Sequence, residues 1–262
     1  MPSGPTLRFL GAADSQGVPR WWCACSVCRD ARGGGVNART RPSVLIEGPE
    51  RVLIDAAPEL RLQASREGLT GFSAALITHA HNDHVLGLGD LADWSRWTGA
   101  RCPIYAPREV MEALAARFPY LQTASYRART PLLALEDAAC SRTFAGYRVS
   151  ALRVPHGFNG FAYGFRFEGP GGAWGYLPDC LDLADLAPWR GLKLLVLGAS
   201  FFREAAPKAG RSVYDVQEAL ALLAELKPKR ALLTHLGHGV DARQGAPDGV
   251  QYARDGLVVP LP

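Results

Sequence analysis

The sequence predicts an α/β fold in which two β-sheets pack face to face and helices cover their outer sides. Strand-like apolar runs come in two batches, one in each half of the chain, and each batch is interrupted and followed by segments with helical periodicity. No linker rich in Pro, Gly and Ser is long enough to separate two units, so residues 1–262 are expected to form one domain. A chain of 262 residues suffices for one sizeable core.

The first batch of strands is expected at residues 7–10, 43–47, 51–55 and 74–78. The EGPE turn, with its Gly and Pro, predicts a hairpin between the second and third of these strands. A short helix is expected after Pro58, ending at Gly68. The helix expected at residues 85–97 is weakened by Gly87 and Gly89.

The second half opens with a helix predicted over residues 107–118, whereas residues 126–141 carry no clear pattern. Ser212 is expected to cap a helix that runs to about Leu226. A strand ending in His235 follows, and residues 251–259 are expected to form a terminal strand pair. The second batch of strands is expected at residues 147–154, 161–167, 173–177 and 192–197.

Composition excludes several classes of protein. Hydrophobic residues make up 48% and charged residues 21%, which argues against a disordered or fibrous chain. The net charge of +4 comes without a long basic run, so a general nucleic-acid-binding surface is not expected. No run approaches the roughly 20 apolar residues of a membrane helix, and no secretory signal is visible, so we expect a cytoplasmic location.

The motif HAHNDH directly after the strand at 74–78 is the strongest chemical signal. Its histidines and aspartate, His79, His81, Asp83 and His84, would make a poor core because imidazoles and carboxylates need partners when buried. A metal ion supplies such a partner. The first two histidines can point together where the strand ends, and the last two residues can face a second ion. The alternative is a solvated polar loop.

Four further residues each follow a strand. His156, Asp179 and His235 are weak signals singly, but all lie at the carboxyl ends of predicted strands, where sites of open sheets gather. Asp55 ends the strand at 51–55, and either orients a ligand imidazole or caps a turn.

A cluster of cysteines near the N-terminus predicts a separate structural zinc site in a loop over residues 21–30. Three thiols within six residues favour metal binding over disulfides in a reducing compartment, and chance clustering of buried thiols is the alternative. A closed zinc site takes four ligands, and His238 is the histidine that the other cluster leaves over. We therefore expect a site made of Cys23, Cys25, Cys28 and His238. The isolated Cys102, Cys140 and Cys180 are expected to be buried apolar side chains.

The segment THAHNDHVLGL resembles the HxHxDH signature of the metallo-β-lactamase superfamily, and the later His156, Asp179 and His235 follow in the order of its remaining ligands. This resemblance implies a four-layer αββα sandwich. It also implies one metal ion held by His79, His81 and His156, a second held by Asp83, His84 and His235, and Asp179 as the bridge between them.

The stretch GAADSQGVPRWWCACSVCRDAR is similar to the PhnP-type phosphodiesterases of this superfamily, which use such a loop and a THxxH pair for a structural zinc. The stretch APELRLQA also resembles PqqB-like proteins, which lose parts of the HxHxDH set that this chain keeps. The resemblance implies a dinuclear hydrolase that cleaves small or cyclic phosphodiesters with a metal-bridging hydroxide, with Asp83 and Asp179 as catalytic residues. The metals could be Zn, Mn or Fe, and the relatives imply a homodimer.

Other functions stay open at this point. A thioester or lactone hydrolase could use the same ions, and so could a non-catalytic protein that binds metal and a small ligand in a biosynthetic pathway. A tRNA-processing nuclease is disfavoured because no basic insertion is present.

One feature departs from the PhnP-type pattern. A further histidine opens the helix that corresponds to residues 212–226 in those phosphodiesterases, whereas GRSVYDVQ has none, so that either Arg211, Ser212 or Tyr214 replaces it or the substrate differs. Arg203, Lys208 and Arg211 could hold a phosphate by charge-assisted hydrogen bonds, or could be ordinary surface residues.

Overall fold

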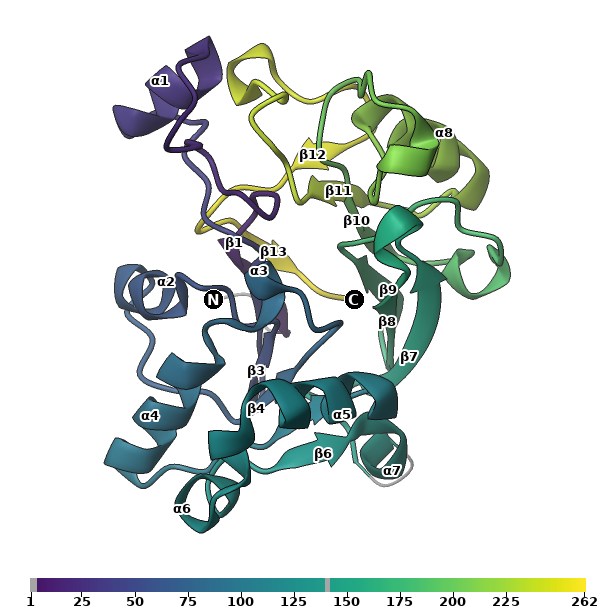
Figure 1. The fold of residues 1–262 in the computed structure, drawn as a ribbon. Coiled ribbons are helices and arrows are strands. Elements are labelled where there is room, and N and C mark those ends of the chain that lie inside the picture. The colour runs from purple at the N-terminus through teal and green to yellow at the C-terminus, as the bar shows by residue number, and fades with distance from the viewer. Residues whose placement is uncertain (1–3, 140–141) are drawn as a thin grey trace.

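The computed structural model describes residues 4–139 and 142–262, and within them two facing β-sheets form the centre of the molecule (Figure 1). The first sheet contains β1 (Thr6–Gly11), β2 (Ser43–Glu47), β3 (Arg51–Ile54), β4 (Ala74–Leu76), β5 (Ile104–Ala106), β6 (Leu132–Ala134) and β13 (Val258–Pro260). The second contains β7 (Arg148–Pro155), β8 (Phe161–Gly169), β9 (Gly172–Leu177), β10 (Leu194–Gly198), β11 (Ala231–Thr234) and β12 (Gln251–Tyr252). The strand orders are β13-β1-β2-β3-β4-β5-β6 and β12-β11-β10-β9-β8-β7.

The helices lie mainly outside these sheets, as Figure 1 shows for α2 and α4 on one side and α8 on the other. They are α1 (Ser26–Arg32), α2 (Leu60–Arg66), α3 (Asn82–Val85), α4 (Leu88–Thr98), α5 (Arg108–Arg117), α6 (Ala124–Arg127), α7 (Leu135–Ala139) and α8 (Val216–Leu226). Single 3-10 turns occur at Pro119–Gln122, Gly157–Asn159, Ala187–Trp189, Lys208–Gly210 and Ala242–Gln244.

Three buried clusters of apolar side chains account for the layers. The central cluster lies between the sheets and joins residues such as Ile54 of β3 to Phe167 and Trp174 of the second sheet, where the two rings stack at a centroid distance of 4.0 Å. A second cluster packs α2, α4 and α5 on the outer face of the first sheet, and a third packs α8 on the outer face of the second. The predicted four-layer αββα sandwich is confirmed.

The hairpin of β2 and β3 is antiparallel as predicted, but two of the predicted helices differ from the structure. The helix expected at 85–97 is divided into α3 and α4 at Gly87, whose Cβ position is blocked by the carbonyl oxygen of Ala57. The cap of α8 is Asp215 rather than Ser212, because Asp215 and Glu218 form a reciprocal capping box.

The last two strands do not pair with each other. β12 joins the second sheet beside β11, and β13 joins the first beside β1, so that the C-terminal segment contributes an edge to each sheet. The segment at 126–141 that sequence left unassigned contains α6 in part, β6 and α7. Cys102 and Cys180 are buried as expected, and Cys140 lies outside the described residues. None of the helices in the described part of the chain has both the length and the apolar character needed to cross a bilayer.

Candidate active site

Seven predicted ligand residues come together where strands of both sheets end. The polar cluster follows β4, and the others follow β7, β9 and β11. Ligand atoms lie within 4.8 Å of one another in each of three overlapping groups, which are His79 with His81 and His156, His79 with His84 and Asp179, and Asp83 with His84 and His235. Segments up to about 150 residues apart in the chain therefore meet at one centre.

The position of His84 is fixed by a buried carboxylate beneath it. Asp55, which follows β3, accepts a hydrogen bond from His84 Nδ1 at 2.7 Å and another from the Thr78 backbone N–H at 2.8 Å. Both side chains are fully buried. A proton held on Nδ1 leaves the lone pair of Nε2 directed at the centre, which is the form a metal-binding imidazole needs.

Other ligand histidines are held in the same way. His156 Nδ1 donates to the backbone oxygen of Ser212 at 2.8 Å, so its Nε2 is the free ring nitrogen. His81 Nδ1 lies 2.9 Å from His79 Nε2 and 3.3 Å from His156 Nε2. Three ring nitrogens thus converge on one point, as ligands of a common cation do.

Several atoms of the centre are buried without a hydrogen-bond partner. They are His84 Nε2, Asp179 Oδ2 and His235 Nε2. They nevertheless lie close together, with 3.1 Å between the first two and 3.3 Å between His235 Nε2 and Asp179 Oδ1. An unsatisfied buried polar atom costs about 1–3 kcal/mol, and divalent cations between these atoms would satisfy them. The donor set therefore fits metal ions.

The charges at the centre agree with this fit. Burial lowers the pKa of His79 well below its ordinary value, and the nearby His84 lowers it further, which keeps the ring neutral. Burial alone would raise the pKa of Asp179, but His235 and His84 beside it bring that pKa below its usual range. The pKa of Asp83 is lowered by the same two histidines, although burial again opposes the shift. Burial would lower the pKa of His84 and of His235, but the carboxylates around them raise both, so these two rings carry the compensating charge. A divalent cation would replace their protons, because neutral imidazoles and ionised carboxylates are the forms that bind divalent metals.

A cavity of about 350 Å³ adjoins the centre, and His235 forms part of its lining. Ser200 and Asn159 also line it, and the amide nitrogen of Asn159 lies 3.4 Å from His156 Nε2. Two arginines line it as well, Arg20 and Arg211. Sequence reasoning missed Arg20 and Asn159, because neither belongs to the ligand motifs and only folding brings them to the cavity.

The proposed phosphate-binding residues are placed differently from one another. Arg211 lines the cavity, but its guanidinium forms an ion pair with Glu218. Lys208 forms an exposed ion pair with Asp182 at 2.6 Å, and Arg203 is exposed. Of the candidates for the missing histidine, Ser212 holds His156 through its backbone, and the Tyr214 hydroxyl accepts a hydrogen bond from the Leu183 backbone N–H at 2.7 Å.

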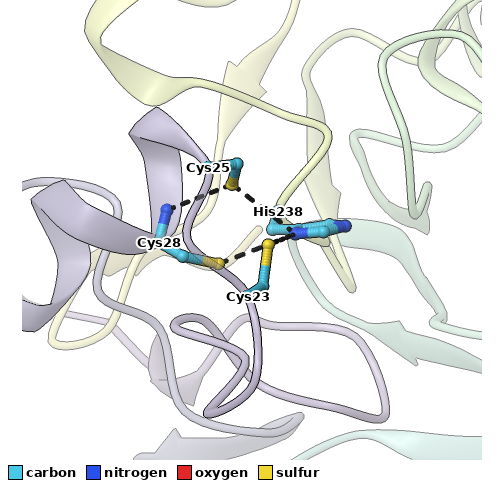
Figure 2. Close-up of side chains that lie close together, drawn as sticks. All are labelled: Cys23, Cys25, Cys28 and His238. Atoms are coloured by element: carbon cyan, nitrogen blue, oxygen red, sulfur yellow. Dashed lines mark hydrogen bonds between the residues drawn. The ribbon is translucent and has the colours of Figure 1, made fainter.

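The cysteine cluster forms a second group of ligand atoms. Figure 2 shows the thiols of Cys23, Cys25 and Cys28 directed at His238. Their sulfurs lie 3.3, 3.7 and 3.6 Å from Nδ1 of this ring. Tetrahedral zinc with ordinary bond lengths would place sulfur and nitrogen about 3.6 Å apart. Burial raises the pKa of the Cys28 thiol to about 11, a cost that a bound cation would offset.

Comparisons with known proteins agree with this geometry. Residues 50–236 match the model of the beta-lactamase superfamily domain. The crystal structure of a diphosphatase from the PhnP family superposes with a TM-score of 0.81 at 30% identity, over 98% of this chain and 97% of that one.

Two curated relatives carry other names. A coenzyme PQQ synthesis protein B of Cupriavidus necator is 26% identical over 97% of this chain and 96% of its own length. An octanoyltransferase of Porphyromonas gingivalis is 29% identical over 95% of this chain, but the chain spans only 50% of that relative. The family match covers well over half of the residues, and the sandwich has its ligand cluster where the strands of both sheets end, so the chain belongs to the beta-lactamase superfamily and has the metallo-β-lactamase fold.

Proposed function

We propose that this protein is a metal-dependent phosphodiesterase with two divalent ions at its centre. The observation that supports this most is the set of buried, unpartnered ligand atoms that converge from both sheets. In this proposal His79, His81 and His156 would hold one ion, and Asp83, His84 and His235 would hold the other. Asp179 lies in a group with His79 and His84 and, through its other oxygen, 3.3 Å from His235 Nε2, which suits a bridge between the ions.

The chemistry follows from the ligand set and the cavity. Paired divalent ions supply Lewis acidity for the attack of water on phosphorus and neutralise charge on the phosphoryl oxygens. Asp55 and Ser212 orient the ligand rings, and the amide of Asn159 is placed to donate a hydrogen bond to a substrate oxygen. Zn, Mn and Fe all suit imidazole and carboxylate ligands. Similarity to a PhnP-family diphosphatase supports a phosphate ester as substrate, either a phosphodiester or a diphosphate ester.

The competing function is that of a non-catalytic protein that binds metal and ligand. Similarity to PQQ synthesis protein B over nearly the whole chain favours it. The complete ligand set favours the hydrolase, because a protein that only binds a ligand has no need for three overlapping ligand groups.

A turnover screen tests the proposal. Metal-reconstituted protein is assayed with bis-p-nitrophenyl phosphate and 2′,3′-cyclic nucleotides, and in parallel with thioesters and lactones. Asp179→Asn should abolish phosphodiester turnover and lower the metal content by at least one ion per chain. Asp185→Asn, an exposed aspartate six residues further on, is the matched control and should behave as the wild type. Turnover of thioesters or lactones alone, or of no ester, would refute the phosphodiesterase.

A further inference from the structure

Arg20 lies where the cavity beside the active centre meets the cysteine cluster. Its loop leads from β1 into the cysteine segment, and its side chain lines the same cavity as His235. Nη1 lies 2.9 Å from Nε2 of His238, whose other ring nitrogen faces the three thiols. Nη2 donates to Asp14 Oδ2 at 2.9 Å. One side chain therefore contacts the structural cluster and the substrate cavity together.

The surroundings of Arg20 hold more hydrogen-bond donors than acceptors. The Nε atom of Arg20 is buried without a partner. The other carboxylate oxygen of Asp14 already accepts a hydrogen bond from the Gln16 backbone N–H at 3.1 Å. If Nδ1 of His238 binds a cation together with the thiols, the ring proton must be on Nε2, so this nitrogen donates and Arg20 cannot donate to it. The guanidinium is then left with Asp14 and with whatever acceptor occupies the cavity.

The second arginine of the cavity is not available in this way. Arg211 is 8% exposed, and its guanidinium is held by Glu218, with Asp215 within 4.0 Å. Arg20 has one carboxylate partner, and the ring of Phe201 lies 5.6 Å from its Cζ. An arginine held by an aromatic face with free N–H groups suits the bidentate recognition of phosphate oxygens.

We propose that Arg20 binds the second phosphoryl group of a diphosphate ester whose first phosphorus lies at the metal centre. This inference rests on the proposed function and narrows its substrate class to diphosphate esters. A simple phosphodiester carries one negative charge, whereas a diphosphate diester carries a second at the next phosphorus. The cavity of about 350 Å³ has both His235 and Arg20 in its lining, and in this proposal the second charge of the ester faces the guanidinium.

Two esters that differ only in the number of phosphoryl groups test this. They are bis-p-nitrophenyl phosphate and P1,P2-bis(p-nitrophenyl) diphosphate, with products separated by chromatography. In Arg20→Ala, kcat/KM for the diphosphate should fall about 10- to 100-fold, as expected for a lost charge-assisted contact, mainly through KM. The value for the monophosphate should change less than about threefold. Arg20→Lys keeps the charge without the planar fork and should give an intermediate preference.

The control is Arg148→Ala, which removes the same charge from an exposed ion pair with Glu168 at the far end of β7. It should leave both esters unaffected. Zinc is counted in every variant. If kcat/KM falls equally for both esters and one zinc is lost, Arg20 only supports the cysteine cluster. If the ratio of kcat/KM for the two esters is the same in Arg20→Ala as in the wild type, the proposal is overturned in any case.

The failure of the proposed function gives a different result. If the wild type hydrolyses neither ester, the phosphodiesterase is wrong, and Arg20 is judged by calorimetric titration of the diphosphate ester into wild type and Arg20→Lys, the variant that keeps the charge beside Asp14. Weaker binding in the variant supports the subsite, and equal dissociation constants overturn it.

Discussion

Replacement of Asp55 by Asn should weaken metal binding at the active centre without changing its shape. Asp55 accepts hydrogen bonds from His84 Nδ1 at 2.7 Å and from the backbone and side chain of Thr78 at 2.8–3.0 Å. Its backbone has a φ of 60°, which Asn adopts about as readily as Asp. In Asp55→Asn the remaining side-chain oxygen can still accept the hydrogen bonds from Thr78. The amide nitrogen then faces the Nδ1–H of His84, so two hydrogen-bond donors face each other and the bond to His84 is lost.

The magnitude follows from the bonds lost. A buried hydrogen bond to a charged group is worth about 1.5–3 kcal/mol. Loss of a partner that orients a ligand histidine lowers metal affinity about 10- to 100-fold, which agrees with that energy at about 1.4 kcal/mol for each factor of ten. We therefore expect the metal at His84 to be released at chelator concentrations about 10- to 100-fold lower than in the wild type.

The assay is metal content after dialysis against graded chelator, measured by elemental analysis. Ser43→Ala is the control, because Ser43 donates to the backbone oxygen of Asp55 at 2.8 Å and is equally buried. It should lower stability in urea by about 1 kcal/mol and leave metal retention unchanged. If Asp55→Asn retains metal like the wild type, the carboxylate does not orient the ligand ring, and the explanation given for His84 is wrong.

Three further expectations concern the scaffold. Gly87→Ala should destabilise the fold by about 1–3 kcal/mol in urea because its Cβ meets a backbone carbonyl, whereas Gly89→Ala, whose Cβ would lie 3.5 Å from its nearest neighbour, should stabilise it by about 0.4–1 kcal/mol. Cys25→Ser should release one zinc per chain and lower Tm, because binding at a structural site is folding free energy; Cys102→Ser, at an isolated buried thiol, should lower Tm with zinc unchanged. Although burial would raise it, hydrogen bonds from two arginines lower the pKa of Glu67. Glu67→Gln should therefore lower the free energy of unfolding by about 1 kcal/mol near pH 7. The difference between variant and wild type should vanish as pH falls through the lowered pKa.

Much of the centre was predictable because its ligands follow strands. Apolar runs in the sequence predict where the strands end, and HAHNDH, His156 and His235 follow the ends of β4, β7 and β11. The carboxyl ends of such strands meet at the edge of a sheet. The cysteine cluster was predictable for a related reason, since three soft ligands leave a fourth position that one remaining imidazole can fill.

The rest depends on contacts that no local pattern contains. Ser212 resembles an N-cap in sequence, but its carbonyl is engaged by His156, and Asp215 caps α8 with help from Glu218. Residues 251–259 were expected to form a strand pair, but β12 and β13 each join the edge of a different sheet, which the local sequence does not specify. Arg20 contacts His238 although 218 positions separate them in the chain, and the sequence around neither residue predicts this contact.

A short segment after β11 links the two clusters of ligand atoms. His235 belongs to the active centre and His238 to the cysteine cluster, and the residues between them have little freedom. A Cβ at Gly237 would overlap Asp14 Oδ2, and the backbone N–H of Gly237 donates to Ser200 O at 2.7 Å. Since Asp14 also binds Arg20, a shift of His238 would move the lining of the cavity as well as the segment that carries His235. The cysteine cluster is thus placed to hold one wall of the cavity, because Gly237 and Asp14 connect His238 to that wall.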